Sequence, residues 1–422
     1  MTTPEVLSLP PRGGQYSCSL VSFFIDLFLH TGASLRCAAS AFAVVVRHFH
    51  LDLPVPSFAT IRAWVLRLGC YALLCPLPQA DPWLWIIDHT IQVGAKKLFL
   101  IVGCPLSEIP FGQRCLSLVD LRLVALVPME QSNQYLVDAE LEKATQRTGA
   151  PRLIVSDQGG DLVKGIEHFQ QRHANTVAVG DIAHHAAHVL ENRWERDPRW
   201  GELLKKLSAT NQQIRQTADA FLVSPTLRNK ARFMNVGPLL RFACRVLALS
   251  KKENPNARAK QRYGWLLDYE EDLAGWREQY DVVHETIARV RLHGLNAGTL
   301  EELEKEWGAQ SERTGTKMTR GHMRAYVAKN VRQAKEGETL VGSSEVLESA
   351  FGKLKAKAGE SGKGELTGMA MSLGAILGQH DEKEVREALD AVPQKKAEGM
   401  ISRLLGPTLC WLRHQLFRTG DA

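Results

Sequence analysis

The chain has 422 residues, of which 45% are hydrophobic and 23% charged, and its formal net charge is +6. This length exceeds one ordinary hydrophobic core, so two or three domains are expected, and the composition excludes a chain with long disordered stretches. The mild basic excess permits a nucleic-acid partner but does not by itself indicate one.

The spacing of the cysteines and the hydropathy pattern indicate the cellular compartment. The eight cysteines are scattered without the CxxC pairs of a zinc module, which favours a reducing, cytoplasmic setting. The most apolar early stretch, residues 19–30, is interrupted at helical spacing by Ser19, Ser22 and Asp26. It therefore predicts an amphipathic helix and not a membrane span, and no secretory signal pattern is recognisable.

The N-terminal region predicts a helical domain. Residues 1–16 contain prolines and a Gly-Gly pair, which is typical of a flexible arm. Apolar residues then recur at helical spacing in three stretches, 19–30, 34–50 and 57–69. Ser34 and Ser57 are suitable N-caps for the second and third helices. We expect one domain over residues 17–78.

From residue 79 to residue 185 the pattern is that of a mixed α/β domain. Two strands joined by a turn at Gly94-Ala95 are followed by a third strand and then by alternating helices and strands. The expected strands are 83–94, 96–104, 117–128, 151–157 and 175–181, and the expected helices are 133–147, 160–172 and 183–194. An antiparallel meander followed by βα crossovers predicts a ribonuclease H-like five-stranded mixed sheet with flanking helices.

The remaining chain is helical by its pattern. Strand signals are missing from residues 186–340, which predicts a large all-α insertion. A helix at about 344–358 and further helices up to residue 422 would complete the core.

Two aspartates occupy positions where a carboxylate needs an explanation. Asp88 interrupts the apolar run of the first predicted strand, and Asp157 ends the fourth strand just before Gly159-Gly160. A buried carboxylate is costly unless it binds a cation or a hydrogen-bond partner. Magnesium prefers such hard oxygen ligands. The alternatives are a solvent-facing strand residue for Asp88 and a helix N-cap for Asp157.

A third acid is expected from the helix at 344–358. Glu345 and Glu348 lie three residues apart on one helical face. Glu345 is explained by its place in the first helical turn, where the helix dipole favours an acid. Glu348 adjoins the apolar stripe and is the preferred third ligand, with Glu345 as the alternative.

Four segments together resemble the DDE transposases of bacterial insertion sequences, in particular members with an all-helical insertion between the second and third catalytic acids. The segments are IIDHT, VSDQGGDLVKGI, VAVGDIAHH and SSEVLESAFGKLK, and the resemblance covers roughly residues 15–360. It implies that Asp88, Asp157 and Glu348 are the catalytic acids and hold two magnesium ions, for which manganese can substitute.

The resemblance also implies a reaction and its partners. Water would attack the phosphodiester at a transposon end, and the freed 3′-hydroxyl would then attack target DNA. The expected partner is therefore double-stranded DNA. Because two ends must be held together, a homodimer or a larger assembly is expected, in the bacterial cytoplasm at the nucleoid.

The end of the fifth predicted strand carries a second polar cluster, Asp181 with His184 and His185. Many relatives have a Cys or Asp plus His here, so the cluster could be an accessory site near the scissile phosphate. Asp181 is also the fallback second acid. The alternatives are a helix-capping Asp181 with partly buried histidines, or a structural zinc on His184 and His188.

Several basic residues are candidates for DNA contact. Residues 19–69 are expected to form a three-helix helix-turn-helix unit whose helix after Ser57 would enter the major groove, although a dimerisation role for these helices is an alternative. Lys353, Lys355 and Lys357 continue from the third acid toward the phosphate backbone, and basic stretches at 251–265 and 317–335 are either phosphate contacts or solvated faces. The groove-facing candidates are Ser57, Thr60, Arg62 and Arg67.

Three other functions remain open at this point. A ribonuclease H-like nuclease or resolvase would cut DNA without joining it. A non-catalytic regulator derived from a transposase would only bind DNA. A zinc hydrolase centred on His184 and His188 would contain stoichiometric zinc.

Overall fold

The computed structural model describes residues 9–79, 82–93, 96–227, 232–251, 257–309, 311–359, 368–378, 380–407 and 409–418. The turn expected at Gly94-Ala95 and the first half of the expected N-terminal arm lie outside these residues. The chain divides into two compact units. The first combines Met1–Pro110, Leu116–Ala178 and Ser344–Ala422, and the second combines Phe111–Cys115 and Val179–Ser343.

A five-stranded mixed sheet forms the centre of the first unit, in the order β3-β2-β1-β4-β5. β1 pairs antiparallel with β2 and parallel with β4, and β2 pairs antiparallel with β3. The strands are β1 (Trp83–Val93), β2 (Lys96–Pro105), β3 (Arg122–Met129), β4 (Leu153–Ser156) and β5 (Val177–Gly180). This arrangement confirms the predicted ribonuclease H-like fold, although β3 begins later than expected, after a 3-10 turn at Leu118–Asp120.

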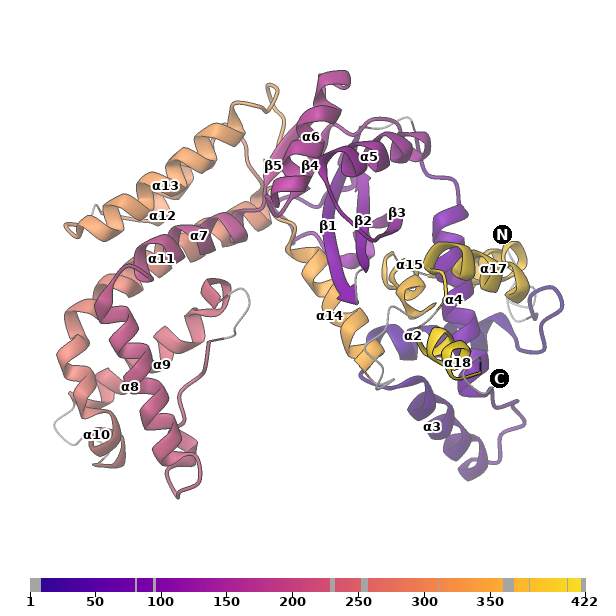
Figure 1. Cartoon of the computed structure of the whole chain (residues 1–422), viewed down its shortest axis with the longest axis horizontal. Helices are drawn as coiled ribbons and strands as arrows, with labels where there is room; N and C mark the ends of the chain where they lie inside the picture. Colours follow the sequence, from indigo (N-terminus) through magenta and orange to yellow (C-terminus); the bar gives the residue numbers. More distant parts are fainter. Residues whose placement is uncertain are drawn as a thin grey trace. The chain divides into compact units, whose positions relative to one another are not determined.

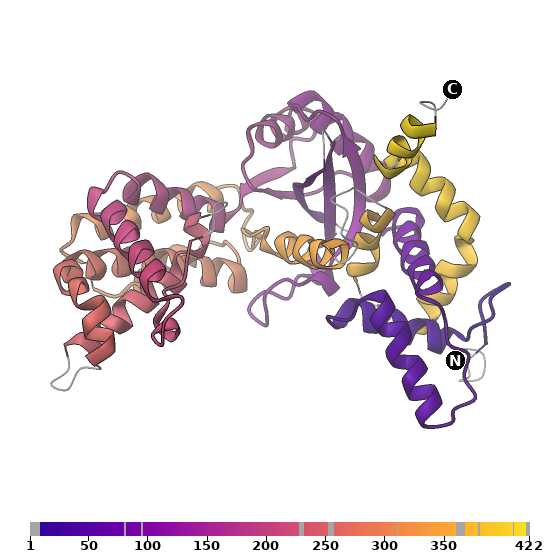
Figure 2. The ribbon, with the colours of Figure 1, turned by 60° about the horizontal axis from the view of Figure 1, so that its bottom comes forward.

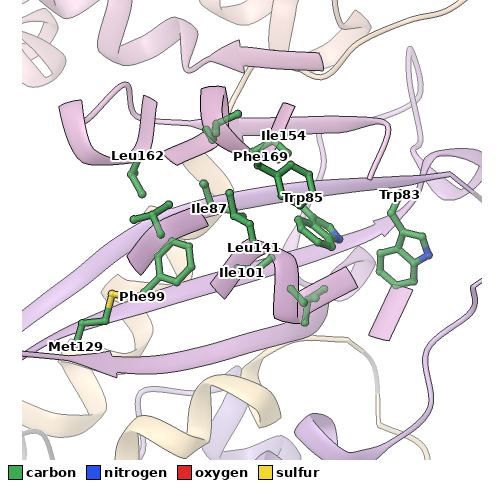
Figure 3. Close-up of a cluster of buried hydrophobic side chains, with 14 residues drawn as sticks. Trp83, Trp85, Ile87, Phe99, Ile101, Met129, Leu141, Ile154, Leu162 and Phe169 are labelled. Carbon is green, nitrogen blue, oxygen red and sulfur yellow. The ribbon is translucent and has the colours of Figure 1, made fainter. Parts of the chain in front are cut away.

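One face of the sheet is covered by α5 (Gln134–Thr148) and α6 (Gly160–Arg172). Figure 3 shows the hydrophobic cluster between the two layers. Because side chains alternate along a strand, the odd-numbered residues of β1 and β2 point into this cluster. They are Trp83, Trp85, Ile87, Phe99 and Ile101, each fully buried. The indole N–H of Trp85 donates to Thr148 at the end of α5 (3.2 Å).

The opposite face of the sheet is also buried. Leu84 and Ile86 of β1 are fully buried there, and α14 (Glu345–Gly359) contacts β1. In both ribbon views α14 lies alongside the sheet (Figures 1 and 2). Strands buried on both faces read as continuous apolar runs, and the segment around Ile86 has this pattern.

The N-terminal helices are α2 (Cys18–His30), α3 (Leu35–His48) and α4 (Phe58–Leu74). The predicted N-caps are confirmed: the Ser34 hydroxyl accepts from the Cys37 N–H, and the Ser57 hydroxyl accepts from the Thr60 N–H, each at 3.1 Å. Whereas the sequence predicts a domain at 17–78, these helices belong to the same compact unit as the sheet.

The reason is that α4 packs against the C-terminal elements, which follow α14 in the sequence. The C-terminal elements are η6 (Gly368–Met371), α15 (Ser372–Ile376), α16 (Glu382–Ala391), α17 (Gln394–Leu405) and α18 (Leu409–Arg418). α4 contacts α15, α16 and α17. The approach is so close that a Cβ built on Gly69 would lie 1.8 Å from the Met371 carbonyl oxygen. Arg147 of α5 extends this packing by donating to the carbonyls of Ala72 and Cys75.

The second unit is mainly helical in its described part, with the end of β5 (Val179 and Gly180) and one isolated bridge between Leu295 and Leu340 as its strand elements. Trp194, Trp200, Trp276 and Phe233 form an aromatic centre. The α-helices are α7 (Ile182–Trp194), α8 (Pro198–Ile214), α9 (Gly237–Ser250), α10 (Ala257–Tyr263), α11 (Glu270–His293), α12 (Thr299–Glu306) and α13 (Thr314–Val331). Within the described ranges, no helix has the length and apolar character needed to cross a bilayer.

Candidate active site

Asp88 lies in the middle of β1, opposite Leu100 of β2. By alternation its side chain shares the face of Leu84 and Ile86, away from the α5/α6 core. The residue is partly buried, and its carboxylate accepts the backbone N–H of His89 at 2.6 Å. The structure thus places this acid on a central strand of the sheet with its side chain partly buried.

Asp157 follows directly on the end of β4. The parallel register pairs Ile86 with Val155 and Ile87 with Ser156, so its continuation by one residue sets Asp157 beside Asp88. Two neighbouring carboxylates repel each other, and a cation or hydrogen-bond donors must compensate for that repulsion. The register therefore brings the first two predicted acids together at one position of the sheet.

A tight turn carries Asp157 from β4 into α6. The carboxylate accepts the backbone N–H of Gly159 at 2.9 Å. Gln158 has φ +67, a left-handed conformation that is unfavourable for a non-glycine residue. Strained residues of this kind cluster at functional sites. Asp157 is not the N-cap of α6, because that position is Gly159 and no side chain caps the helix.

α14 presents the two candidate glutamates. The helix begins at Glu345 and buries Leu347, Ala350 and Phe351, whereas Glu348 is exposed and Glu345 is partly buried. Because α14 contacts β1, both glutamates lie on a helix beside the strand of Asp88. In the described part of the chain, no three His, Cys, Asp or Glu side chains are grouped closely enough to hold a metal ion. Asp88 and Asp157 thus follow the last paired residues of two neighbouring strands, while Glu348, or Glu345, as the third acid stays a prediction.

The Asp181 cluster belongs to the second unit. Asp181 is buried and is the N-cap of α7, where its carboxylate accepts from the backbone N–H of His184 (2.7 Å) and contacts the His184 ring (3.1 Å). His185 stacks on Tyr326, and burial lowers the pKa of His185. These contacts fit the helix-capping alternative. No third ligand joins His184 and His188 among the described residues, so the zinc alternatives gain no support.

Of the predicted DNA-contacting residues, two have structural contacts instead. Arg67 donates to the carbonyls of Val392 (2.7 Å) and Leu389 at the end of α16, and burial lowers its pKa. Lys357 donates to the carbonyls of Thr31 (2.9 Å) and Ala33 (3.0 Å) after α2. These contacts make Arg67 and Lys357 links within the first unit, and their role in DNA binding stays a prediction.

The other predicted DNA contacts are more accessible. Arg62 and Lys355 are exposed, and Lys353 is partly exposed. Ser57 and Thr60 lie at the start of α4 with their hydroxyls 3.0 Å apart. The groove-facing surface predicted for α4 is therefore reduced to its first turns, since Ile61 and the residues from Trp64 to Leu66 are buried.

Sequence reasoning missed a polar cluster beside the two aspartates. Ser132, just before α5, contacts the ring of His89 (2.9 Å) and donates to the carboxylate of Asp161 in the first turn of α6. Burial lowers the pKa of His89. Burial alone would raise the pKa of Asp161, but hydrogen bonds from Ser132 and the helix backbone outweigh it and lower that pKa. In the sequence, only the segment Asp88-His89-Thr90 indicated a polar site here.

Neither a protein-family model nor a curated protein matches the chain. Among solved structures the chain is similar to one described as the Drosophila P element transposase strand transfer complex. The identity is 10% and the TM-score 0.36, over 91% of this chain and 94% of that chain. These values are too low to assign a family.

Proposed function

We propose that the chain is a DNA transposase that cleaves DNA strands at transposon ends and joins them to target DNA. The observation that carries this proposal is the β1–β4 register of a ribonuclease H-like sheet, whose last pair, Ile87 with Ser156, directly precedes Asp88 and Asp157. The order β3-β2-β1-β4-β5 makes β1 and β4 neighbours, so acids distant in the chain meet at one position.

The donor set fits magnesium, which takes hard oxygen ligands. Asp88 and Asp157 would hold the metal, and Glu348 of α14 would complete the set, with Glu345 as the alternative. When bound, two magnesium ions activate the attacking oxygen and stabilise the leaving oxygen. Asp88 sits on a central strand and Asp157 on a hydrogen-bonded turn, so the protein holds both carboxylates before any ligand arrives.

Double-stranded DNA is the proposed partner, bound in part through exposed cations of the first unit. Arg62 and Lys355 are exposed, and Lys353 of α14 lies five residues beyond Glu348. Contacts of this kind are to phosphate and weaken with rising salt. The joining of two ends further requires a homodimer or a larger assembly in the reaction.

The test is a strand-transfer assay with the purified full-length chain. The donor plasmid carries the reading frame together with its flanking DNA, and a second plasmid is the target. We expect magnesium-dependent cleaved ends and joined products, which both Asp88→Asn and Asp157→Asn abolish. Asp26→Asn, on an exposed position of α2, is the matched control and should retain both products.

The outcomes separate the alternatives. Cleavage without joining would indicate a nuclease or resolvase. Specific DNA binding without any cleavage, unchanged in Asp88→Asn, would indicate a regulator and overturn the proposal.

A further inference from the structure

The polar cluster of His89, Ser132 and Asp161, here called the clamp, joins three segments of the first unit. His89 belongs to β1, Ser132 precedes α5 and Asp161 lies in the first turn of α6. The Ser132 hydroxyl is 2.9 Å from His89 Nε2 and donates to Asp161 Oδ2, while His89 Nδ1 is 3.9 Å from the same carboxylate oxygen. A single hydroxyl thus connects two charged or chargeable groups from different elements.

The direction of these hydrogen bonds argues against a serine nucleophile. A serine hydroxyl has one proton, and in the clamp Ser132 donates it to the Asp161 carboxylate. Ser132 must therefore accept a hydrogen bond from the Nε2–H of His89, the reverse of the hydrogen bond that a nucleophilic serine donates to its base. The arrangement is one that holds side chains in place.

Each end of the clamp is next to a candidate catalytic acid. His89 follows Asp88, and its backbone N–H donates to the Asp88 carboxylate at 2.6 Å. Asp161 lies one turn after Asp157. A Cβ built on Gly159, between them, would lie 3.2 Å from Asp157 Oδ1 and 3.3 Å from Asp161 Oδ1. Both carboxylates therefore border the same backbone turn.

The turn needs such support. Gln158 is held at φ +67, which costs about 1–2 kcal/mol for a non-glycine residue, and no side chain caps the N-terminus of α6. β4 ends at Ser156, so the strand ladder no longer fixes the chain at Asp157.

We propose that His89, Ser132 and Asp161 are positioning residues that fix the Asp157 turn against β1, and so set the separation of the Asp88 and Asp157 carboxylates for metal binding. This inference rests on the proposed function, because it concerns the same pair of acids. Ser132 is the most informative member of the clamp because it can be changed without altering the charge of the site.

The test is Mn²⁺ binding to the full-length chain, measured by electron paramagnetic resonance of the free ion, with the thermal midpoint of the metal-free protein measured in parallel. Ser132→Ala is expected to weaken Mn²⁺ binding about tenfold, the lower end of the effect of removing residues that support metal ligands from behind. Ser132→Thr keeps a hydroxyl and is expected to restore binding. Ser40→Ala, at an exposed position of α3, is the matched control.

Asp88→Asn separates the two proposals. If it abolishes Mn²⁺ binding while Ser132→Ala binds as tightly as the unchanged chain, the positioning role is wrong and the metal site stands. A Ser132→Ala variant that only lowers the metal-free midpoint, with unchanged affinity of the folded protein, likewise overturns the inference. If Asp88→Asn binds Mn²⁺ like the unchanged chain, the proposed metal site falls and the positioning role falls with it.

Discussion

At Gly165, α6 packs closely against α5; the clamp lies at the N-terminal ends of these two helices. A Cβ built on Gly165 would lie 2.6 Å from Val137 Cγ1 and 3.1 Å from the Gln134 carbonyl oxygen. Val137 is fully buried in the core cluster and cannot move aside freely. Gly165→Ala should therefore push α6 away from α5, even though alanine is the better helix former.

The magnitude follows from two opposing effects. Alanine in place of glycine gains about 1 kcal/mol of helix propensity, and the overlap with Val137 costs about 2–3 kcal/mol. We expect Gly165→Ala to lower the free energy of unfolding by about 1–2 kcal/mol. Val137→Ala alone should lower it by about 2–3 kcal/mol through the lost methyl groups and the cavity they leave.

The double variant gives the decisive value, because the new methyl group occupies space that Val137 vacates. If the two substitutions acted independently, their losses in unfolding free energy would add. We expect the double variant to lose about 2 kcal/mol less than the sum of the two single losses. Equilibrium unfolding in urea, followed by tryptophan fluorescence, gives each value. The control is Gly399→Ala in α17, where an added Cβ meets no atom within 4 Å and should be stabilising. Additive effects, or equal shifts for Gly165→Ala and Gly399→Ala, would refute the steric reasoning.

Three further predictions address the site and its surroundings. Arg67→Ala should lower the free energy of unfolding by about 1–3 kcal/mol, since carbonyls at the end of α16 lose a charged donor. Arg62→Ala, in contrast, should weaken DNA binding and reduce its dependence on salt without changing the thermal midpoint. Burial lowers the pKa of His185 below its ordinary 6.5, so the stability contributed by its neutral form is present above pH 6.5 and is lost as the pH falls toward the folded-state pKa. His185→Phe should therefore reduce the slope of the thermal midpoint against pH in that window. An unchanged slope would contradict the assignment. Gln158→Val places a β-branched residue at φ +67 and should lower the free energy of urea unfolding, because such residues are disfavoured there beyond the cost that glutamine already bears, while Gln158→Gly should not lower it.

The sequence predicted well what depends on local pattern. Alternating or continuous apolar runs located the five strands, and the hydroxyls of Ser34 and Ser57 marked two helix starts, because such signals lie within a few residues. The adjacency of β1 and β4, the strands that carry or directly precede Asp88 and Asp157, also followed from the predicted topology.

Features that depend on distant contacts were not predictable in this way. Arg67 looked like a groove-facing cation, and only the packing of α4 against α16, more than 300 residues later, gives it its carbonyl partners. The clamp combines residues from β1, a loop and α6, none of which has a motif of its own. The glutamates of α14 depend on how a helix is rotated and seated against the sheet, which a helical pattern does not specify.

The insertion between β5 and α14 has a consequence for synthesis on the ribosome. All five strands have been translated by Gly180, but the partners of α4, such as Met371 and Val392, follow much later. At ordinary elongation rates the apolar side of α4 waits about 15–60 s for its cover. A nascent chain in this interval exposes a surface that chaperones bind, and stalling there would favour aggregation over folding.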